Sequence, residues 1–338
     1  MIPFYRIILK RALSVSWKFK WLWGFGFFAA FLGNGNLYEF VYSMYSNLAT
    51  GQSFFYTVTQ YSNSGLFGMI SFGRLQYLWQ NDISAFSMGI FTLLMAFCFL
   101  AVLISLAVIS QGAIAKGLIN ADQKKKTTFR QSFNEGLEKF WPILELNFIT
   151  KVVFVGILLL VIYVIANIMP GNLIADTIII IVSFVVFIVL GIIIYFLTIY
   201  GTAFIVLRNK NVFQALKEAW HVFRKNVLLN IEMGLLLFII NVLAVLAGVI
   251  LLFIVLAPFI LLYFMLMFTG SSFGLTVISI LMVIVFVGGL ILFGAWYNTF
   301  QLGAWLILFE ELALNKTKSK TLRVFEYLRE KKRKLKKA

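Results

Sequence analysis

Histidine is the side chain that most often supplies acid–base and metal chemistry, and the sequence contains a single one, His221. A zinc helix of the H-E-x-x-H type needs two histidines, so that class of site is excluded. His221 lies between Trp220 and Phe223, which favours a residue on the polar face of an interfacial helix over a general base. The single cysteine, Cys98, lies in an apolar run and is expected to pack as a small hydrophobic side chain rather than react.

One segment matches a catalytic pattern. Gly270-Ser271-Ser272-Phe273-Gly274 reads G-x-S-x-G, the nucleophile elbow of serine hydrolases. That elbow requires a strand before it and a histidine within hydrogen-bond reach, whereas this segment joins two apolar runs. We interpret it as a turn between two helices. Phosphate loops of the G-x-x-x-x-G-K-[ST] type are also missing. The sequence therefore predicts no catalytic residues, no cofactor and no bound metal.

Ionisable side chains inside apolar segments are the next candidates, because a charge within a membrane is costly and usually functional. Lys151 and Glu232 each lie about one turn into a long apolar run. They could pair with each other, with Glu145 as a competing partner for Lys151, or each could extend to the membrane surface. The sequence leaves these alternatives open.

Amide side chains form a second intramembrane set. Such groups usually hydrogen-bond between helices, although a solute pathway could use the same chemistry. The candidates are Asn167, Asn241, Asn298 and Gln301, with Gln111 near the end of another run.

The composition identifies the elements that must position these residues. The 338 residues are 62% hydrophobic and 12% charged, against roughly 45–50% and about 25% in soluble domains. This balance excludes a soluble globular protein. Continuous apolar runs predict helices rather than barrel strands. We predict an all-α, polytopic membrane helix bundle with six spanning helices, near residues 19–33, 84–115, 146–169, 177–207, 228–268 and 275–309.

The distribution of charge orients these helices. The formal net charge is +16. With a cytoplasmic N-terminus, the external segments contain one basic residue, Arg74, against Glu39, Asp82 and Asp176. Basic residues concentrate in cytoplasmic loops, so this segregation predicts cytoplasmic N- and C-termini.

Two of the six runs have unusual lengths. The first is short, roughly 21 Å against a hydrocarbon core of about 30 Å. The basic residues before it resemble those of a signal peptide, but their long spread favours an uncleaved anchor. The fifth run is long, and Pro258 is expected to kink it, leaving Phe259–Phe268 as a tilted or interfacial extension.

An internal repeat is visible at a constant offset of 83 residues. Phe133-Asn134-Glu135-Gly136-Leu137 aligns with Leu216-Lys217-Glu218-Ala219-Trp220, and a fainter copy begins at Leu9. Each copy predicts a short amphipathic cytoplasmic helix followed by a pair of long apolar helices. The two clear copies resemble a family of bacterial six-helix membrane proteins that includes the membrane domain of some glycerophosphoryl diester phosphodiesterases. The soluble catalytic barrel of those enzymes is missing here, so the resemblance implies the fold and not their activity.

Two further segments point to lipid. Residues 37–80 carry only Glu39 and Arg74 as charges and are rich in Tyr, Phe and Trp, which favour the headgroup level. This segment is expected to cap the helices at the outer leaflet or to form a platform for lipid tails or sugars.

The tail, residues 316–338, has 11 basic and two acidic residues, with Leu322, Phe325, Leu328 and Leu335 at helical spacing. We expect a basic amphipathic helix that binds anionic lipid, with nucleic acid or a ribosome as the less favoured partner. The predicted headgroup contacts are Arg323, Arg329, Lys331, Lys332, Arg333, Lys334, Lys336 and Lys337.

Taken together, these patterns predict a six-span domain over residues 1–315 and a separate basic tail. We expect a multi-pass, non-enzymatic protein of a bacterial-type plasma membrane that contacts or organises anionic lipids or partner membrane proteins. A transporter or channel for a small or lipid-like solute is the alternative, and a membrane enzyme ranks third.

Overall fold

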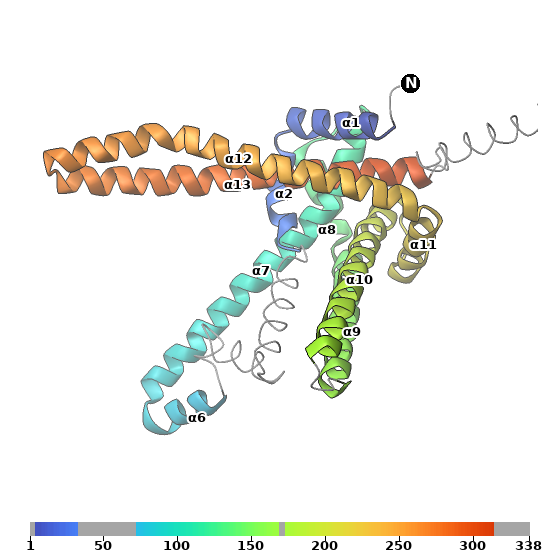
Figure 1. Ribbon diagram of the computed structural model, residues 1–338, viewed down its shortest axis with the longest axis horizontal. Coiled ribbons are helices and arrows are strands. Elements are labelled where there is room, and N and C mark those ends of the chain that lie inside the picture. The colour runs from blue at the N-terminus through green and yellow to red at the C-terminus, as the bar shows by residue number, and fades with distance from the viewer. Residues whose placement is uncertain (1–3, 33–71, 169–172, 314–338) are drawn as a thin grey trace, which may run out of the picture. The chain divides into compact units, whose positions relative to one another are not determined.

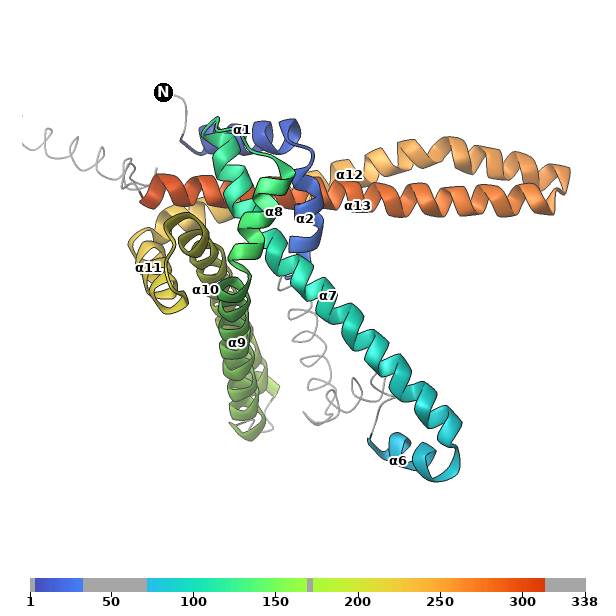
Figure 2. The same cartoon turned by 180° about the vertical axis from the view of Figure 1, so that it is seen from behind.

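Every regular element that the computed structural model describes is a helix. It describes residues 4–32, 72–168 and 173–313. The helices, shown in Figures 1 and 2, are α1 Phe4–Lys18, α2 Leu22–Ala30, α6 Phe72–Asn81, α7 Ile83–Asp122, α8 Phe129–Glu138, α9 Phe140–Ile168, α10 Leu173–Arg208, α11 Val212–Lys225, α12 Val227–Thr269 and α13 Ser272–Ala313.

Five of the described helices are long and apolar enough to cross a membrane. They are α7, α9, α10, α12 and α13, and they correspond to the second to sixth predicted runs. The first run is described only as α2, whose nine residues extend roughly 14 Å. Residue 33 of this run, with most of the aromatic segment 37–80, lies outside the described residues.

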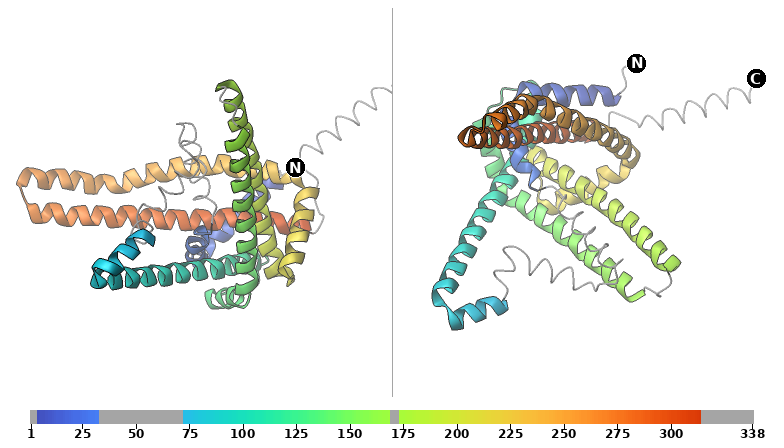
Figure 3. Two further views of the ribbon diagram at one scale, coloured as in Figure 1. Left: turned by 90° about the horizontal axis from the view of Figure 1, so that it is seen from below. Right: turned by 60° about the vertical axis from the view of Figure 1, so that its left-hand side comes forward.

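Helices α12 and α13 form one long antiparallel hairpin (Figure 3). Its register is constant, because Gly248 packs on Phe293, Leu252 on Gly289 and Leu266 on Gly274. The helix continues through Pro258, and the residues beyond it pack along α13 as a full partner. The tilted or interfacial position expected for Phe259–Phe268 stays a prediction, and the structure shows that this segment continues α12 and packs along α13.

The turn of this hairpin is the segment that matches G-x-S-x-G. Gly270 has a φ of 67° and ends α12 in the left-handed conformation that glycine adopts without strain. The Ser271 hydroxyl then accepts a hydrogen bond from the backbone N–H of Gly274 at 3.2 Å, as an N-cap does. The interpretation of this segment as a helix–helix turn is confirmed.

The chain forms two compact units. The first contains α1, α2, α8, α11, α12 and α13 with the C-terminal ends of α7 and α10, from Ile109 and Ile199 onward. The second contains α6, the start of α7, and α9 and α10 from Leu144 to Thr198.

The core of the first unit lies where the C-terminal ends of α7, α10 and α13 meet. The Tyr200 and Phe204 rings of α10 lie 5.4 Å and 4.9 Å from the Phe309 ring of α13. Leu118 of α7 packs against Gly303 of α13. We call this core, with α1, α8 and α11 around it, the hub. Outside the hub the hairpin exposes large apolar side chains from Phe273 to Leu292, roughly 30 Å of helix and enough to match a hydrocarbon core.

The three short helices α1, α8 and α11 are found at the positions where the repeat predicts them, and each leads into an apolar helix. They define copy 1 (α1 to α7), copy 2 (α8 to α10) and copy 3 (α11 to α13). Equivalent positions are buried in all three copies. These positions are Ile8, Ser132 and Ala215; then Ala12, Gly136 and Ala219; and, in the next helix, Leu22, Leu146 and Leu229.

Candidate functional site

The buried stripe on each short helix determines which side chains face outward. In α1 and α11 the buried residues recur at intervals of three or four, so the basic residues between them lie on the opposite face. The small buried residues Ala12 and Ala219 allow these helices to pack closely on the core of the hub. Both helices therefore hold a row of cations at the surface of a packed core.

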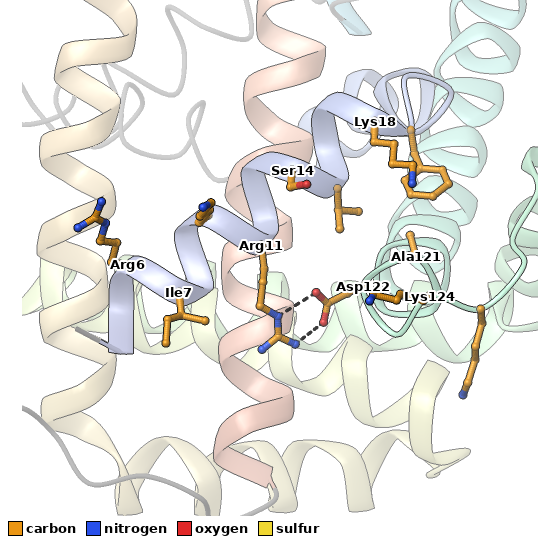
Figure 4. A pocket seen from close by; sticks show the side chains of 12 residues that line it. Arg6, Ile7, Arg11, Ser14, Lys18, Ala121, Asp122 and Lys124 are labelled. Carbon is orange, nitrogen blue, oxygen red and sulfur yellow. Dashed lines mark hydrogen bonds and ion pairs between the residues drawn. The ribbon is translucent and has the colours of Figure 1, made fainter. Parts of the chain in front are cut away.

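The first pocket lies beside α1 and has a volume of about 740 Å³. Arg11 anchors it, as Figure 4 shows: its guanidinium donates to both carboxylate oxygens of Asp122 at the end of α7. The same guanidinium donates to Glu311 at the end of α13, at 2.8 Å. Arg11 thus joins three helices, and its own charge is matched by two carboxylates.

These contacts alter the acid–base behaviour of Arg11. The hydrogen bond that Arg11 donates to Asp122, with a smaller contribution from the one to Glu311, raises the pKa of Arg11 above its usual range despite partial burial. The two carboxylates therefore favour the charged form of the guanidinium at the junction of α1, α7 and α13.

Five further cations line this pocket: Arg6, Lys10, Lys18, Lys124 and Lys125. In the described part of the chain, none of the five forms an ion pair with a carboxylate. Lys18 on α1 and Lys124 after α7 border the same hollow from different elements (Figure 4). Lys124 has a φ of 57°, a left-handed backbone that ends α7 and turns the chain toward α8. The result is a concave, strongly cationic site.

A second pocket, of about 1030 Å³, lies beside α11. Its lining repeats that of the first pocket at an offset of 207 residues. Lys217 occupies the position of Lys10, and Lys225 the position of Lys18. The other equivalent pairs are Ile7 and Gln214, Arg11 and Glu218, Ser14 and His221, Val15 and Val222, and Phe19 and Asn226.

Further cations and one acid complete the second pocket. Arg208, Lys210 and Arg224 also line it, and Lys210 pairs with Glu218 at 3.0 Å. The single histidine therefore lies in a cationic pocket on a surface helix, at the polar position predicted for it.

Helix α8 lacks the equivalent cations. Asn134 replaces Lys10 and Lys217, and Pro142 replaces Lys18 and Lys225. Glu135, at the position of Arg11, pairs with Lys116 of α7 at 3.3 Å. Only the two outer copies therefore keep a cationic row.

This chemistry suits the binding of phosphate-bearing anions. Lysine and arginine supply several charge-assisted hydrogen bonds to phosphate oxygens. Within the described ranges, no group of three or more His, Cys, Asp or Glu gathers that could hold a metal.

The predicted intramembrane charges have different surroundings. Glu232 of α12 accepts a hydrogen bond from the Tyr5 hydroxyl of α1, a partner that the sequence reasoning missed. Lys151 and Glu145 both lie on α9 in the second unit, the former half-buried and the latter exposed. Because Lys151 and Glu232 belong to different units, their pairing stays a prediction.

Among the amides, Asn298 has a defined structural role. Its Nδ2 donates to the backbone carbonyl of Gly26 at 2.6 Å and so joins α13 to α2. Asn241 and Gln301 are half-buried on α12 and α13. Asn167 lies on α9, with its side chain outside what the structure describes, and the tail cations from Arg323 to Lys337 are likewise outside the described residues.

The α1 and α11 cations were not among the predicted site residues. Their positive charge served only to predict which side of the membrane each segment faces. The signal that identifies them is the repeat itself, because aligning its copies places Lys10 on Lys217 and Lys18 on Lys225.

Comparison with known proteins gives one match. A family model described as "Domain of unknown function (DUF7847)" matches residues 49–300, which include α11 and most of α13 but not α1. No curated protein and no solved structure matches the chain.

Proposed function

The chain belongs to the DUF7847 family, a domain of unknown function, and we propose that it is a non-enzymatic membrane protein that binds and organises anionic lipids at its cytoplasmic face. The observation that carries this proposal is the repetition of one cationic pocket on α1 and α11. Repeated lysines at equivalent positions beside apolar helices match a surface of phosphate headgroups.

The surface of α1 supports this position at the membrane. Beside its cations, α1 exposes Ile7, Leu13 and Trp17, the last at 59%. Exposed apolar side chains next to lysines are typical of a helix lying at the interface between headgroups and acyl chains. Trp17 also packs edge-on against Trp296 of α13, which fixes it where the hairpin enters its exposed apolar stretch.

We further propose six spans, cytoplasmic termini and a bacterial-type plasma membrane as the location. The charge segregation supports the orientation, and the first apolar run would supply the sixth span. Single cysteines test this in a Cys98→Ser background. Thr127→Cys should react with a membrane-impermeant maleimide only after permeabilisation, whereas Ser271→Cys should react in intact cells. The reverse pattern would contradict the orientation.

Lipid binding is tested by thermal unfolding of the purified protein in detergent. A ligand that binds the folded state raises the Tm. Phosphatidylglycerol should raise it clearly at 50 mM NaCl and much less at 500 mM, because salt screens exposed charges. Phosphatidylcholine should have little effect. Equal stabilisation by the two lipids at both salt concentrations would refute the proposal.

A further inference from the structure

A third pocket lies on the other side of α1, between α1, α12 and α13. Its volume is about 540 Å³, within the range of roughly 300–1000 Å³ usual for small-molecule sites. Apart from two basic residues, its lining consists of apolar and aromatic side chains, including Leu9, Leu236 and Ala244. We call it the apolar groove.

The apolar groove and the first cationic pocket share two residues. Arg6 and Lys10 line both. They lie four positions apart on α1, so they project on the same face of the helix. One molecule with an anionic head and an apolar tail could therefore place its head on Arg6 and Lys10 and its tail in the groove.

Two residues that line the apolar groove each have a buried donor. The Tyr297 hydroxyl and the Trp296 indole N–H both belong to lining residues, and both atoms are buried without a hydrogen-bond partner among the described residues. A buried donor left unpaired is unfavourable and rare in native proteins. The ester and glycerol oxygens of a glycerolipid are acceptors that a hydrocarbon alone lacks.

The apolar groove also adjoins exposed apolar surface. Leu243, Val245 and Leu246, next to Ala244 on α12, are 51–60% exposed. An acyl chain in the groove is therefore continuous with the apolar surface that this helix exposes.

We propose that the apolar groove binds one acyl chain of an anionic glycerophospholipid whose phosphate rests on Arg6 and Lys10. This inference rests on the proposed function for the headgroup and goes beyond it in assigning the tail, the glycerol-ester contacts and a single site. Tyr297 and Trp296 donate to the ester region, and the walls of α12 and α13 exclude water from the chain.

Native mass spectrometry of the full-length protein with added phosphatidylglycerol tests this. Ala244→Phe fills the groove without changing any charge. Ala247→Phe, on the exposed side of the same helix, is the matched control. Ala244→Phe should weaken the tightest phosphatidylglycerol binding by at least about tenfold, whereas Ala247→Phe should bind as the wild type does.

Unchanged binding by Ala244→Phe would overturn the acyl-chain site. Equal retention of phosphatidylcholine would overturn its anionic selectivity, and loss of a dimer peak in Ala244→Phe would assign the groove to a second copy of the chain. The proposed function fails separately, if replacing the lysines of both cationic pockets by glutamine leaves phosphatidylglycerol binding intact.

Discussion

Helices α1 and α11 differ from α8 in what their outward faces do, although all three occupy equivalent positions in the repeat. α1 and α11 present lysines at the positions of Lys10 and Lys18. Copy 2 has Asn134 and Pro142 at these positions, and α8 packs on α7 through Gly136, at a position that is buried in all three copies. The difference teaches that helices at equivalent positions of a repeat can share one buried stripe and still present different outward faces, cationic in two copies and uncharged at these positions in the third.

The largest effect is expected where α8 packs most closely. A Cβ on Gly136 would overlap the Ile109 carbonyl oxygen and lie 3.0 Å from the Ala113 nitrogen, and neither backbone atom can move easily. Gly136→Ala should lower the free energy of unfolding by about 1–3 kcal/mol, measured by SDS titration in mixed micelles.

The control for this substitution is Gly24→Ala in α2, where an added Cβ meets nothing within 4 Å. It should be neutral or stabilise by up to about 1 kcal/mol, because alanine favours helix. If both substitutions had the same effect, the close contact of Gly136 with α7 would not contribute to stability.

The next prediction compares the stability that ion pairs contribute at one equivalent position of the repeat, Arg11 in α1 and Glu218 in α11. Arg11 has two carboxylate partners, one of them largely buried, whereas the Lys210–Glu218 pair is about 40% exposed on both sides. Arg11→Met should cost about 1–2 kcal/mol of stability after allowance for solvent screening. Glu218→Gln should cost no more than about 0.5 kcal/mol. Equal losses in thermal unfolding would show that Arg11 has no special role in joining the three helices.

A substitution that makes α8 resemble α1 and α11 should increase its binding to anionic lipid. Asn134→Lys restores the cation found at Lys10 and Lys217. One basic residue near an anionic surface contributes about 1 kcal/mol, so affinity for phosphatidylglycerol vesicles should rise by about fivefold at low salt. Vesicle flotation measures it, with Asn134→Gln as the uncharged control. No difference between the two variants would mean that α8 does not face the headgroups.

Particular residues show how far the sequence could predict this protein. Continuous apolar runs located the long helices, and the absence of a strand and a nearby histidine identified the Gly270 turn. The contacts of Glu232 with Tyr5 and of Asn298 with Gly26 could not be predicted, because they join segments more than 200 residues apart whose meeting depends on tertiary packing. The sequence indicated the cationic pockets only through a loose repeat. A row of lysines on a single helix cannot be distinguished by sequence from an ordinary solvent-exposed face.

Native mass spectrometry with phosphatidylglycerol is the most direct test of the claim that α1 and α11 bind anionic lipid. The test variant carries Lys10→Gln, Lys18→Gln, Lys217→Gln and Lys225→Gln. The control carries Lys20→Gln, Lys126→Gln, Arg130→Gln and Lys139→Gln, which remove the same charge outside both pockets. At about 1 kcal/mol per cation, the test variant should lose roughly 30-fold in affinity at each pocket, and the control should retain its bound lipid. Equal lipid binding by the two variants would contradict the account.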